Sequence, residues 1–374
     1  MDKKNSLGRL IGCLIVASLV ASGAWAQEPS PTLLVLAKSD NTVAIVDPAS
    51  LQVLARIPAG PDPHEIVASD DGKLAFISNY GGSDSALNTI SVVDLVARKP
   101  LPPIDLGALH STHGLAFAGG KLYFTAETNK VVGRYDPATQ RVDWILGTGQ
   151  DRTHMIAVSR SLERIVTTNV NSGTISIIEQ VPQPNGGYGP PPGRAAVGSS
   201  DGAPGQYLPA NAGPPSGGPR LTWEVTSVPA GHGAEGFDIS PDGKEIWAAN
   251  ARDATVTIID VATRKATETI PIPLRGANRL KFTTDGTRVL ISALGAGASD
   301  SCLLVMDAST RKQVKQLKFG GGAAGILMAP DGSRAYVAVS ATDKIAVVDL
   351  KTLEVVGEIS AGKQPDGLAW AVRN

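Results

Sequence analysis

The chain has 374 residues, of which 42% are hydrophobic but only 5% aromatic, and its 34 basic and 35 acidic residues leave a formal net charge of −1. This balance provides no basic excess to attract nucleic acid, so we expect no nucleic-acid partner. The apolar residues are mostly Val, Ile, Leu and Ala, which suits a fold of stacked β-sheets.

The first 26 residues have the features of a secretory signal peptide. A basic start is followed by an apolar run over 10–20 and by an A-x-A cleavage site at 24–26. We therefore expect 1–26 to be cleaved and the mature chain, 27–374, to be exported to the bacterial periplasm or the cell exterior. No second stretch is long and apolar enough to cross a bilayer, so the sequence does not predict an integral membrane protein.

Seven short apolar runs each end in an acidic residue, and these acidic positions are 47, 42, 43, 81, 47 and 42 residues apart. They are Asp47, Asp94, Asp136, Glu179, Asp260, Asp307 and Asp349. A period in the low forties with several strands per period is typical of a β-propeller. The clearest unit, 233–273, reads as four antiparallel strands, here named A to D in chain order, with a tight turn at 241–243 between strands A and B.

The two ends of the mature chain supply the seventh blade between them. The N-terminus provides strands B, C and D over 33–36, 42–46 and 53–57, and the C-terminus provides an unpaired strand A over 366–370. Pairing these segments would close the ring and remove two exposed sheet edges. The sequence therefore predicts one all-β domain over 27–374, a seven-bladed β-propeller with four antiparallel strands per blade.

The spacing of 81 residues comes from an insertion at 181–220, where 10 of 40 residues are Gly and 10 are Pro. Such a segment cannot bury enough apolar surface to fold by itself. We expect it to be a disordered loop that joins strands C and D of one blade.

Three of the five histidines occupy one position of the repeat, the first residue of strand A in three consecutive blades. They are His64, His113 and His154, and the same position elsewhere holds Glu235, Asn278, Ala324 and Asp366. Because strand A is the innermost strand, its start should lie at the mouth of the central channel. Strand B should end on the same face, which adds Lys38, Asn79, Glu127, Asn169, Asn250, Leu294 and Ser340.

Three neutral imidazoles with an open coordination position suit a divalent transition metal such as Zn, Cu or Fe. A metal-bound water could then attack an ester or lactone carbonyl. In this hypothesis His64, His113 and His154 are metal ligands and Glu127 or Glu235 is the catalytic base. The ligand would contact Lys38, Asn79, Asn169, Asn250 and Asp366. The alternative is that the repeat copied these histidines for structural hydrogen bonds, and that the asparagines serve turns.

Several units share further residues with a known kind of repeat. The segment 240–260 contains SPDG, WAAN and TVTIID, and related runs occur at 68–79 and 329–339. These units resemble the YVTN-type seven-bladed β-propeller repeat family, which is related to lactonase-like and surface-layer-type propeller proteins. The resemblance covers the mature chain except the insertion, and it implies the fold more strongly than any activity.

The sequence thus predicts an exported propeller that binds a metal ion or a small ligand at the channel mouth. It leaves open whether the protein is an enzyme, which would then be a metal-dependent lactonase- or esterase-like hydrolase or a lyase. The alternatives are a non-catalytic binding or scaffold propeller for a protein or cell-envelope partner, and a subunit of a periplasmic redox enzyme. We expect a monomer.

Overall fold

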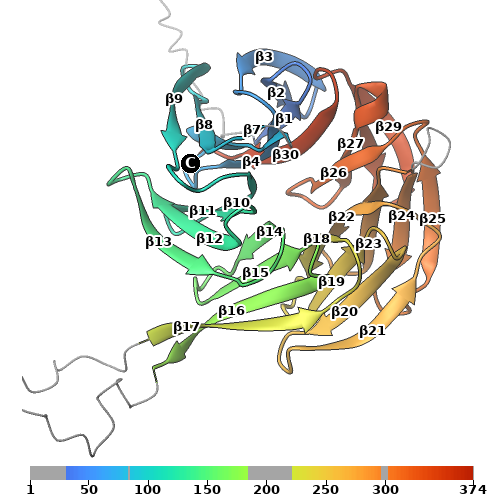
Figure 1. The fold of residues 1–374 in the computed structure, drawn as a ribbon. Coiled ribbons are helices and arrows are strands. Elements are labelled where there is room, and N and C mark those ends of the chain that lie inside the picture. Colours follow the sequence, from blue (N-terminus) through green and yellow to red (C-terminus); the bar gives the residue numbers. More distant parts are fainter. Residues whose placement is uncertain (1–30, 83–84, 184–220, 296–301, 374) are drawn as a thin grey trace, which may run out of the picture.

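Seven four-stranded antiparallel sheets surround a central axis as the blades of a propeller (Figure 1). The structure, a computed structural model, describes residues 31–373 apart from 83–84, 184–220 and 296–301. This arrangement confirms the predicted fold. The predicted signal peptide and nearly all of the predicted insertion lie outside the described residues. Within the described part, no helix has the length and apolar character needed to cross a bilayer.

The strands of the first four blades follow the predicted order. Blade 1 contains β1 (Thr32–Ala37), β2 (Thr42–Asp47), β3 (Gln52–Pro58) and β30 (Pro365–Ala371). Blade 2 contains β4 (Pro63–Ala68), β5 (Leu74–Asn79), β8 (Thr89–Asp94) and β9 (Lys99–Asp105). Blade 3 contains β10 (Thr112–Ala118), β11 (Lys121–Ala126), β12 (Val131–Asp136) and β13 (Arg141–Gly147). Blade 4 contains β14 (Thr153–Val158), β15 (Arg164–Asn169), β16 (Thr174–Pro182) and β17 (Leu221–Pro229).

The other three blades have the same composition. Blade 5 contains β18 (Ala234–Ile239), β19 (Glu245–Asn250), β20 (Thr255–Asp260) and β21 (Lys265–Pro271). Blade 6 contains β22 (Ala277–Phe282), β23 (Arg288–Ala293), β24 (Cys302–Asp307) and β25 (Gln313–Lys318). Blade 7 contains β26 (Ala323–Met328), β27 (Arg334–Val339), β28 (Lys344–Asp349) and β29 (Glu354–Ile359). A short pair, β6 (Gly81–Gly82) and β7 (Ser85–Ala86), and a 3₁₀ turn, η1 (Ser340–Thr342), lie in connections.

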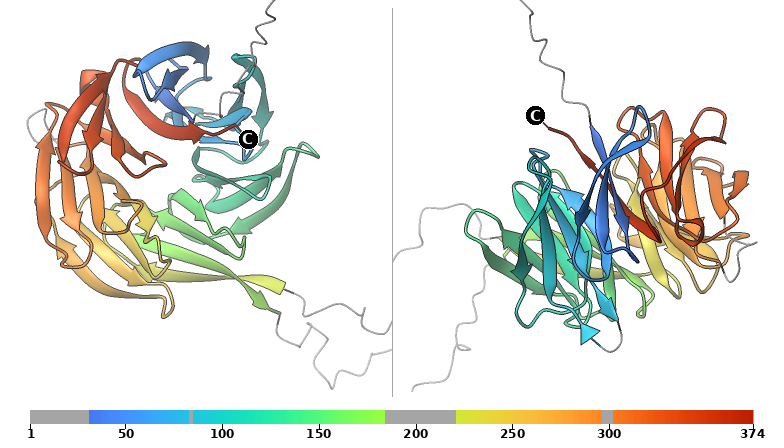
Figure 2. Two further views of the ribbon diagram at one scale, coloured as in Figure 1. Left: turned by 180° about the vertical axis from the view of Figure 1, so that it is seen from behind. Right: turned by 90° about the horizontal axis from the view of Figure 1, so that it is seen from above.

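The ring closes through the two ends of the described chain, as predicted. Strand β30 pairs antiparallel with β1, placing Leu33 opposite Trp370 and Thr32 opposite Ala371. Both views in Figure 2 show the C-terminal strand lying against the N-terminal strands. This pairing satisfies backbone groups that would otherwise form two open sheet edges.

The insertion begins two residues later than the sequence suggested. Val181 and Pro182 continue β16, where they pair with Thr222 and Leu221 of β17. Strand formation extends because two antiparallel strands can keep pairing beyond the blade wherever their partners remain in register. The resulting β16–β17 ribbon extends outward from the ring (Figure 1).

The hydrophobic core consists of seven clusters, each lying between neighbouring blades. Strand β19 shows why strand B of each blade is almost uniformly apolar. Trp247 and Ala249 pack into the cluster shared with blade 6, whereas Ile246 and Ala248 pack into the cluster shared with blade 4. Alternate residues therefore enter different cores, and a strand buried on both faces loses its polar positions.

The acidic residues that end strand C stabilise the turn into strand D. Asp47, for example, accepts a hydrogen bond from the backbone N–H of Ala49 at 3.1 Å. The other five aspartates of this set bind backbone N–H groups two or three residues on in the same way. Glu179 is the exception, because its carboxylate pairs with Arg164 and Arg264. These residues shape the repeat and lie outside the site described next.

Candidate functional site

The second residue of every A strand lies at one end of the central channel. There the structure contains a pocket of about 330 Å³, small enough for one small organic molecule. Its lining includes this residue from all seven blades, together with the proposed Lys38. The seven are His64, His113, His154, Glu235, Asn278, Ala324 and Asp366. The three histidines thus lie together in one pocket, each as the second residue of its strand and not as the first residue, which the sequence predicted.

The A strands hold these residues by packing backbone against backbone. The residue after the site position is a glycine in four blades, and a Cβ on Gly114 would lie 2.4 Å from the carbonyl oxygen of His154. A Cβ on Gly367 would similarly lie 2.5 Å from the carbonyl oxygen of His64. Only glycine permits such an approach, so at these four boundaries the backbone of the site residue abuts the preceding A strand.

Hydroxyl groups on strand B fix the site residues across the blade boundary. Thr125 Oγ1 accepts from the N–H of Gly114 at 2.9 Å and donates to the carbonyl of His154 in the next blade at 2.7 Å. Thr168 repeats this arrangement one blade further on and donates to the carbonyl of Glu235 at 2.7 Å. Each hydroxyl thus ties the start of its own strand A to the site residue of the neighbouring blade.

Replacing Thr125 by valine should therefore destabilise the propeller and displace His154. The buried N–H of Gly114 would lose its acceptor, which costs about 2 kcal/mol of unfolding free energy. Urea unfolding measures this loss, with Thr128→Val as the control. Thr128 is exposed, and within the described residues its hydroxyl bonds to Ser111 Oγ alone, so its variant should change the free energy of unfolding by less than about 0.5 kcal/mol. Equal effects of the two variants would contradict the role assigned to Thr125.

His154 lies between two carboxylates at the centre of a buried hydrogen-bond network. Its Nδ1 contacts Glu127, and its Nε2 lies 3.1 Å from Glu235 Oε2. Burial alone would lower the pKa of His154, but the hydrogen bonds with both carboxylates outweigh it and raise that pKa. In the same way, burial opposes but the contact with His154 prevails, lowering the pKa of Glu235 to about 2. The geometry therefore favours an imidazolium at His154 and a carboxylate at Glu235.

His113 packs against His154 and has the opposite protonation preference. The two ring centroids are 3.7 Å apart, and the His113 side chain is almost fully buried. Burial, followed by the charge of His154, holds the pKa of His113 well below its usual value. Among the described residues, His113 Nδ1 has no hydrogen-bond partner. A neutral imidazole thus lies in contact with a cationic one at the wall of the pocket.

His64 completes the row of imidazoles, with its ring centroid 5.1 Å from that of His113. Its Nε2 lies 3.2 Å from Asp62 Oδ1, and its Nδ1 lies 3.4 Å from Lys38 Nζ. Burial and the charge of Lys38 together lower the pKa of His64. His64 is therefore also neutral near pH 7.

A buried ion pair spans the channel below the histidines. Glu65 of blade 2 and Arg279 of blade 6 follow the site position of their strands, and Arg279 Nη2 lies 2.5 Å from Glu65 Oε1. Arg279 also donates to the side-chain oxygen of its neighbour Asn278 at 3.1 Å. Burial raises the pKa of Glu65 despite the opposing charge of Arg279. Each member of the pair depends on the other to remain charged inside the channel.

The structure places the three predicted asparagines outside the pocket. Asn79, Asn169 and Asn250 are buried, and their amides bind Ser and Thr hydroxyls of strand C in their own blades. The reason is that the asparagines stand one position earlier on strand B than the residues that line the pocket. Each asparagine lies opposite the first residue of strand A, whereas Lys38 and Glu127 follow the residues that do so. Successive residues of a strand face opposite ways, so the predicted alignment mixed two faces.

Correcting this register identifies Tyr80, which the sequence reasoning missed. It follows Asn79 and is equivalent to Glu127 and Lys38, and its hydroxyl donates to Glu127 Oε2 at 2.6 Å. Burial and the bond to Glu127 raise the pKa of Tyr80 to about 12. Its ring also lies against His64 and His113, with centroids 4.9 and 5.3 Å apart.

Arg152 was also missed by the sequence analysis, although its position in the repeat, two residues before a site histidine, could have pointed to it. Arg152 and Asp62 each stand two residues before a site histidine, and both have positive φ values, 56° and 46°. Arg152 Nε lies 3.4 Å from Glu127 Oε2, and its Nη1 lies 3.7 Å from Glu235 Oε1. Its charge partly balances the two carboxylates that hold His154.

The metal hypothesis receives no direct support from the arrangement of side chains. In the part of the chain that the structure describes, no group of three or more His, Cys, Asp or Glu residues could hold a metal ion as placed. Both ring nitrogens of His154 already face carboxylates. A Zn, Cu or Fe ion bound by His64, His113 and His154 therefore stays a prediction, to be tested by metal analysis of the purified protein.

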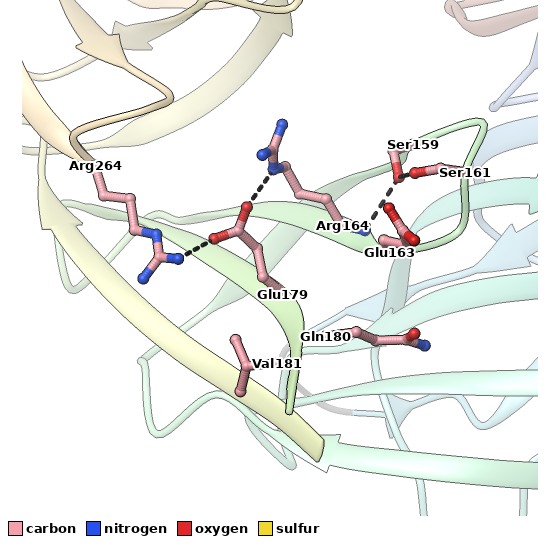
Figure 3. A pocket seen from close by; sticks show the side chains of 8 residues that line it. All are labelled: Ser159, Ser161, Glu163, Arg164, Glu179, Gln180, Val181 and Arg264. Atoms are coloured by element: carbon pink, nitrogen blue, oxygen red, sulfur yellow. Dashed lines mark hydrogen bonds and ion pairs between the residues drawn. The ribbon is translucent and has the colours of Figure 1, made fainter. Parts of the chain in front are cut away.

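A second pocket, of about 430 Å³, lies where blades 4 and 5 adjoin near the β16–β17 ribbon (Figure 3). Its two arginines are already paired with one carboxylate: Arg164 Nε lies 2.7 Å and Arg264 Nη2 2.6 Å from Glu179 oxygens. These contacts fall within the usual range for charge-assisted hydrogen bonds. The axial pocket, where Lys38 and Arg152 lie 3.4 Å or more from their carboxylate partners, is the better candidate for a functional site.

Comparison with solved structures shows many propellers of the same shape. A functionally unknown protein from Desulfotomaculum acetoxidans matches with a TM-score of 0.67 and 12% identity, over 92% of this chain and 100% of that one. A candidate 6-phosphogluconolactonase from Bacteroides uniformis matches with a TM-score of 0.64 and 12% identity, over the same shares of the two chains. The dihydro-heme d1 dehydrogenase NirN, in complex with DHE, matches with a TM-score of 0.59 and 15% identity, over 90% of this chain and 74% of that one.

No family model matches the sequence, and no curated protein matches it. The resemblance to YVTN-type repeats therefore stays a prediction. Identities of 12–15% over nearly the whole chain show a shared fold alone, because one fold can support many activities. On this evidence the chain is a seven-bladed β-propeller whose chemistry has to be inferred from its own axial pocket.

Proposed function

We propose that the protein is an exported propeller that binds a small carbonyl compound in the axial pocket and cleaves it by acid–base catalysis, as a lactonase, an esterase or a lyase. The observation that carries this proposal is the contact between His113 and His154, at a centroid distance of 3.7 Å. Two titratable groups with pKa values shifted in opposite directions are typical of an acid–base pair.

The roles follow from the protonation states. His113 is neutral and lines the pocket, so it serves as the general base towards a water molecule or a substrate proton. His154, whose two nitrogens are held by carboxylates, supplies a fixed positive charge beside that base. Glu127 and Glu235 thus position His154, a different role from the catalytic base expected from the sequence. Arg152 and Lys38 are the donors available for an oxygen that gains negative charge.

Replacing His113 by asparagine should abolish most of the activity while leaving the fold intact. Loss of a general base lowers kcat/KM by roughly 10²- to 10⁴-fold. The assay is base uptake in a pH-stat with γ-butyrolactone, δ-valerolactone and phenyl acetate. His232→Asn is the matched control, because His232 is 80% exposed and binds Asp253 outside the pocket. The wild-type protein should also remain active at about pH 6, since a base with a lowered pKa is still neutral there.

Two alternatives to a hydrolase, a binding or scaffold propeller and a redox-enzyme subunit, predict different results. If the wild-type protein turns over none of these compounds, the hydrolase is rejected and a binding or scaffold propeller for a small ligand or an envelope protein is favoured. A subunit of a periplasmic redox enzyme should carry a chromophore that is visible in an absorption spectrum. The likeness to NirN, which is one of fold, gives that possibility no chemical support at the axial pocket.

A further inference from the structure

The hydrogen-bonding groups of the axial pocket are unequally used. The acceptors are largely occupied: Asn278 Oδ1 accepts from Arg279 at 3.1 Å, and Gln364 Oε1 accepts from Ser39 Oγ at 2.7 Å. Two donors are occupied as well: the hydroxyl of Ser340 donates to the carbonyl of Pro365 at 2.6 Å, and Arg279 is paired with Glu65 at 2.5 Å. The carboxylate of Glu235 faces His154 and Arg152, as described above.

Four other donor groups of the pocket, on Lys38, Arg152, Asn278 and Gln364, are held loosely or not at all. Lys38 Nζ lies 3.6 Å from Asp366 Oδ2, and the Arg152 contacts with carboxylates measure 3.4 and 3.7 Å. These distances exceed the 2.7–2.9 Å of strong charge-assisted hydrogen bonds. Among the described residues, the amide nitrogens of Asn278 and Gln364 make no hydrogen bond, although both residues line the pocket. A ligand that only accepts hydrogen bonds would complete this set.

The charge around the pocket limits the ligand to a single negative charge. Each cation is already near a carboxylate: Lys38 near Asp366, Arg152 near Glu127 and Glu235, and Arg279 against Glu65. A dianion such as phosphate would meet these carboxylates at short range with no unpaired cation to balance it. Lys38 and Arg152, which are only loosely paired, can bind a monoanion at a much lower electrostatic cost.

Part of the pocket lining is apolar. Leu294 and Ala324 of blades 6 and 7 line it, and the Leu294 side chain is 47% exposed. Covering this surface with a short hydrocarbon chain would be favourable, because it removes apolar area from water. A small amphiphilic molecule therefore fits this pocket, with its polar end at the donors and its hydrocarbon end at Leu294 and Ala324.

Resting on the function proposed above, we propose that the substrate or product of this pocket is a small aliphatic monocarboxylate, whose carboxylate accepts from Arg152 and Lys38 and whose chain covers Leu294 and Ala324. Opening of a lactone by water gives a product of this class: water adds to the carbonyl carbon, the ring C–O bond breaks, and a hydroxy-carboxylate and a proton are formed.

Isothermal titration calorimetry with sodium hexanoate, hexanamide and inorganic phosphate tests this assignment. Hexanoate should bind, and hexanamide and phosphate should each bind at least roughly ten-fold more weakly, a difference of about 1.4 kcal/mol. Equal binding of hexanamide, or stronger binding of phosphate, would overturn it.

The variants Arg152→Gln and Lys38→Met should each weaken hexanoate binding by roughly ten-fold, since each removes a charged donor. Arg264→Gln is the matched control, because Arg264 also pairs with a glutamate at similar exposure but lies in the second pocket (Figure 3). In the described part of the chain, the Lys38 side chain pairs with His64 and Asp366 and not with His154, Glu127 or Glu235, so its variant keeps the test valid if Arg152→Gln does not fold. An unchanged affinity in Lys38→Met, or a loss in Arg264→Gln, would overturn the proposal.

The test of the ligand class can fail or succeed independently of the test of the proposed catalysis. Hexanoate binding by a protein that hydrolyses none of the three carbonyl compounds would reject the hydrolase and support the ligand class. Turnover of lactones by a protein that does not bind hexanoate would support the hydrolase and reject the ligand class. His232→Asn, whose exposed side chain lies outside the pocket, should bind hexanoate within about three-fold of the wild-type affinity.

Discussion

Replacing Arg279 by methionine is expected to lower the free energy of unfolding by about 3 kcal/mol or more. Arg279 is buried and the Glu65 side chain is only 15% exposed, and the two side chains meet at 2.5 Å across the central channel. Methionine keeps much of the apolar volume but leaves the Glu65 carboxylate without its partner, which is the costly way to break a buried pair. Urea unfolding at pH 7 measures the effect.

The loss should grow with pH. Without Arg279, burial raises the folded-state pKa of Glu65 further above its unfolded value, so the folded variant keeps a proton that the unfolded chain releases. Stability then falls as pH rises from the unfolded pKa through the folded one. We therefore expect Arg279→Met to be more strongly destabilised at pH 8 than at pH 5.

Two further variants show whether the pair is responsible. Lys281→Met removes a cation from the same strand, where Lys281 Nζ lies 3.2 Å from Asp238 and the Lys281 side chain is 41% exposed, so it should cost less than about 1 kcal/mol. Adding Glu65→Gln to Arg279→Met should restore part of the lost stability. A double variant no more stable than Arg279→Met, at either pH, would show that the uncompensated charge is not the cause.

Acidification below pH 6.5 is expected to destabilise the propeller through His113. Burial and neighbouring charge lower the pKa of His113 in the folded protein. Below pH 6.5 the unfolded chain therefore binds a proton at this residue that the folded protein does not bind. Stability from this group is therefore complete above 6.5 and is lost as pH falls, by up to about 1.4 kcal/mol per pH unit. His64 shifts in the same direction.

His154 acts with the opposite sign. Its raised pKa means that the stability it contributes is complete below 6.5 and is lost as pH rises through the folded value. The site as a whole should thus be most stable near neutral pH, with separate losses on each side.

The slope of stability against pH isolates the contribution of His113. Between pH 6.5 and 5, His113→Asn should reduce the slope of the unfolding free energy against pH by up to about 1.4 kcal/mol per pH unit, the contribution of one proton. Urea unfolding at several pH values measures this slope. His232→Asn provides the control, since the exposed His232 side chain lies outside the pocket. An identical slope in wild type and His113→Asn would mean that His113 is protonated equally in the folded and unfolded chain.

The fold was largely predictable because it depends on local patterns that repeat. Strand B reads as an unbroken apolar run where both faces are buried, and acidic residues at the end of strand C stabilise a turn within their own hairpin. The same periodicity placed His64, His113 and His154 in one register. It was misleading at the end of strand B, where a difference of one residue separates buried Asn79 from Tyr80.

The sequence by itself determined the number of blades, the closure of the ring and the circle of residues around the axis, since strand period and turn chemistry are properties of neighbouring residues. Only the tertiary structure decided which of those residues bind one another and which imidazole carries charge. Glu65 and Arg279 are 214 positions apart, and His154 meets Glu127 and Glu235 from the blades on either side of its own. Protonation inside the pocket depends on burial and on charges brought there by other blades, and no repeat pattern records those distances.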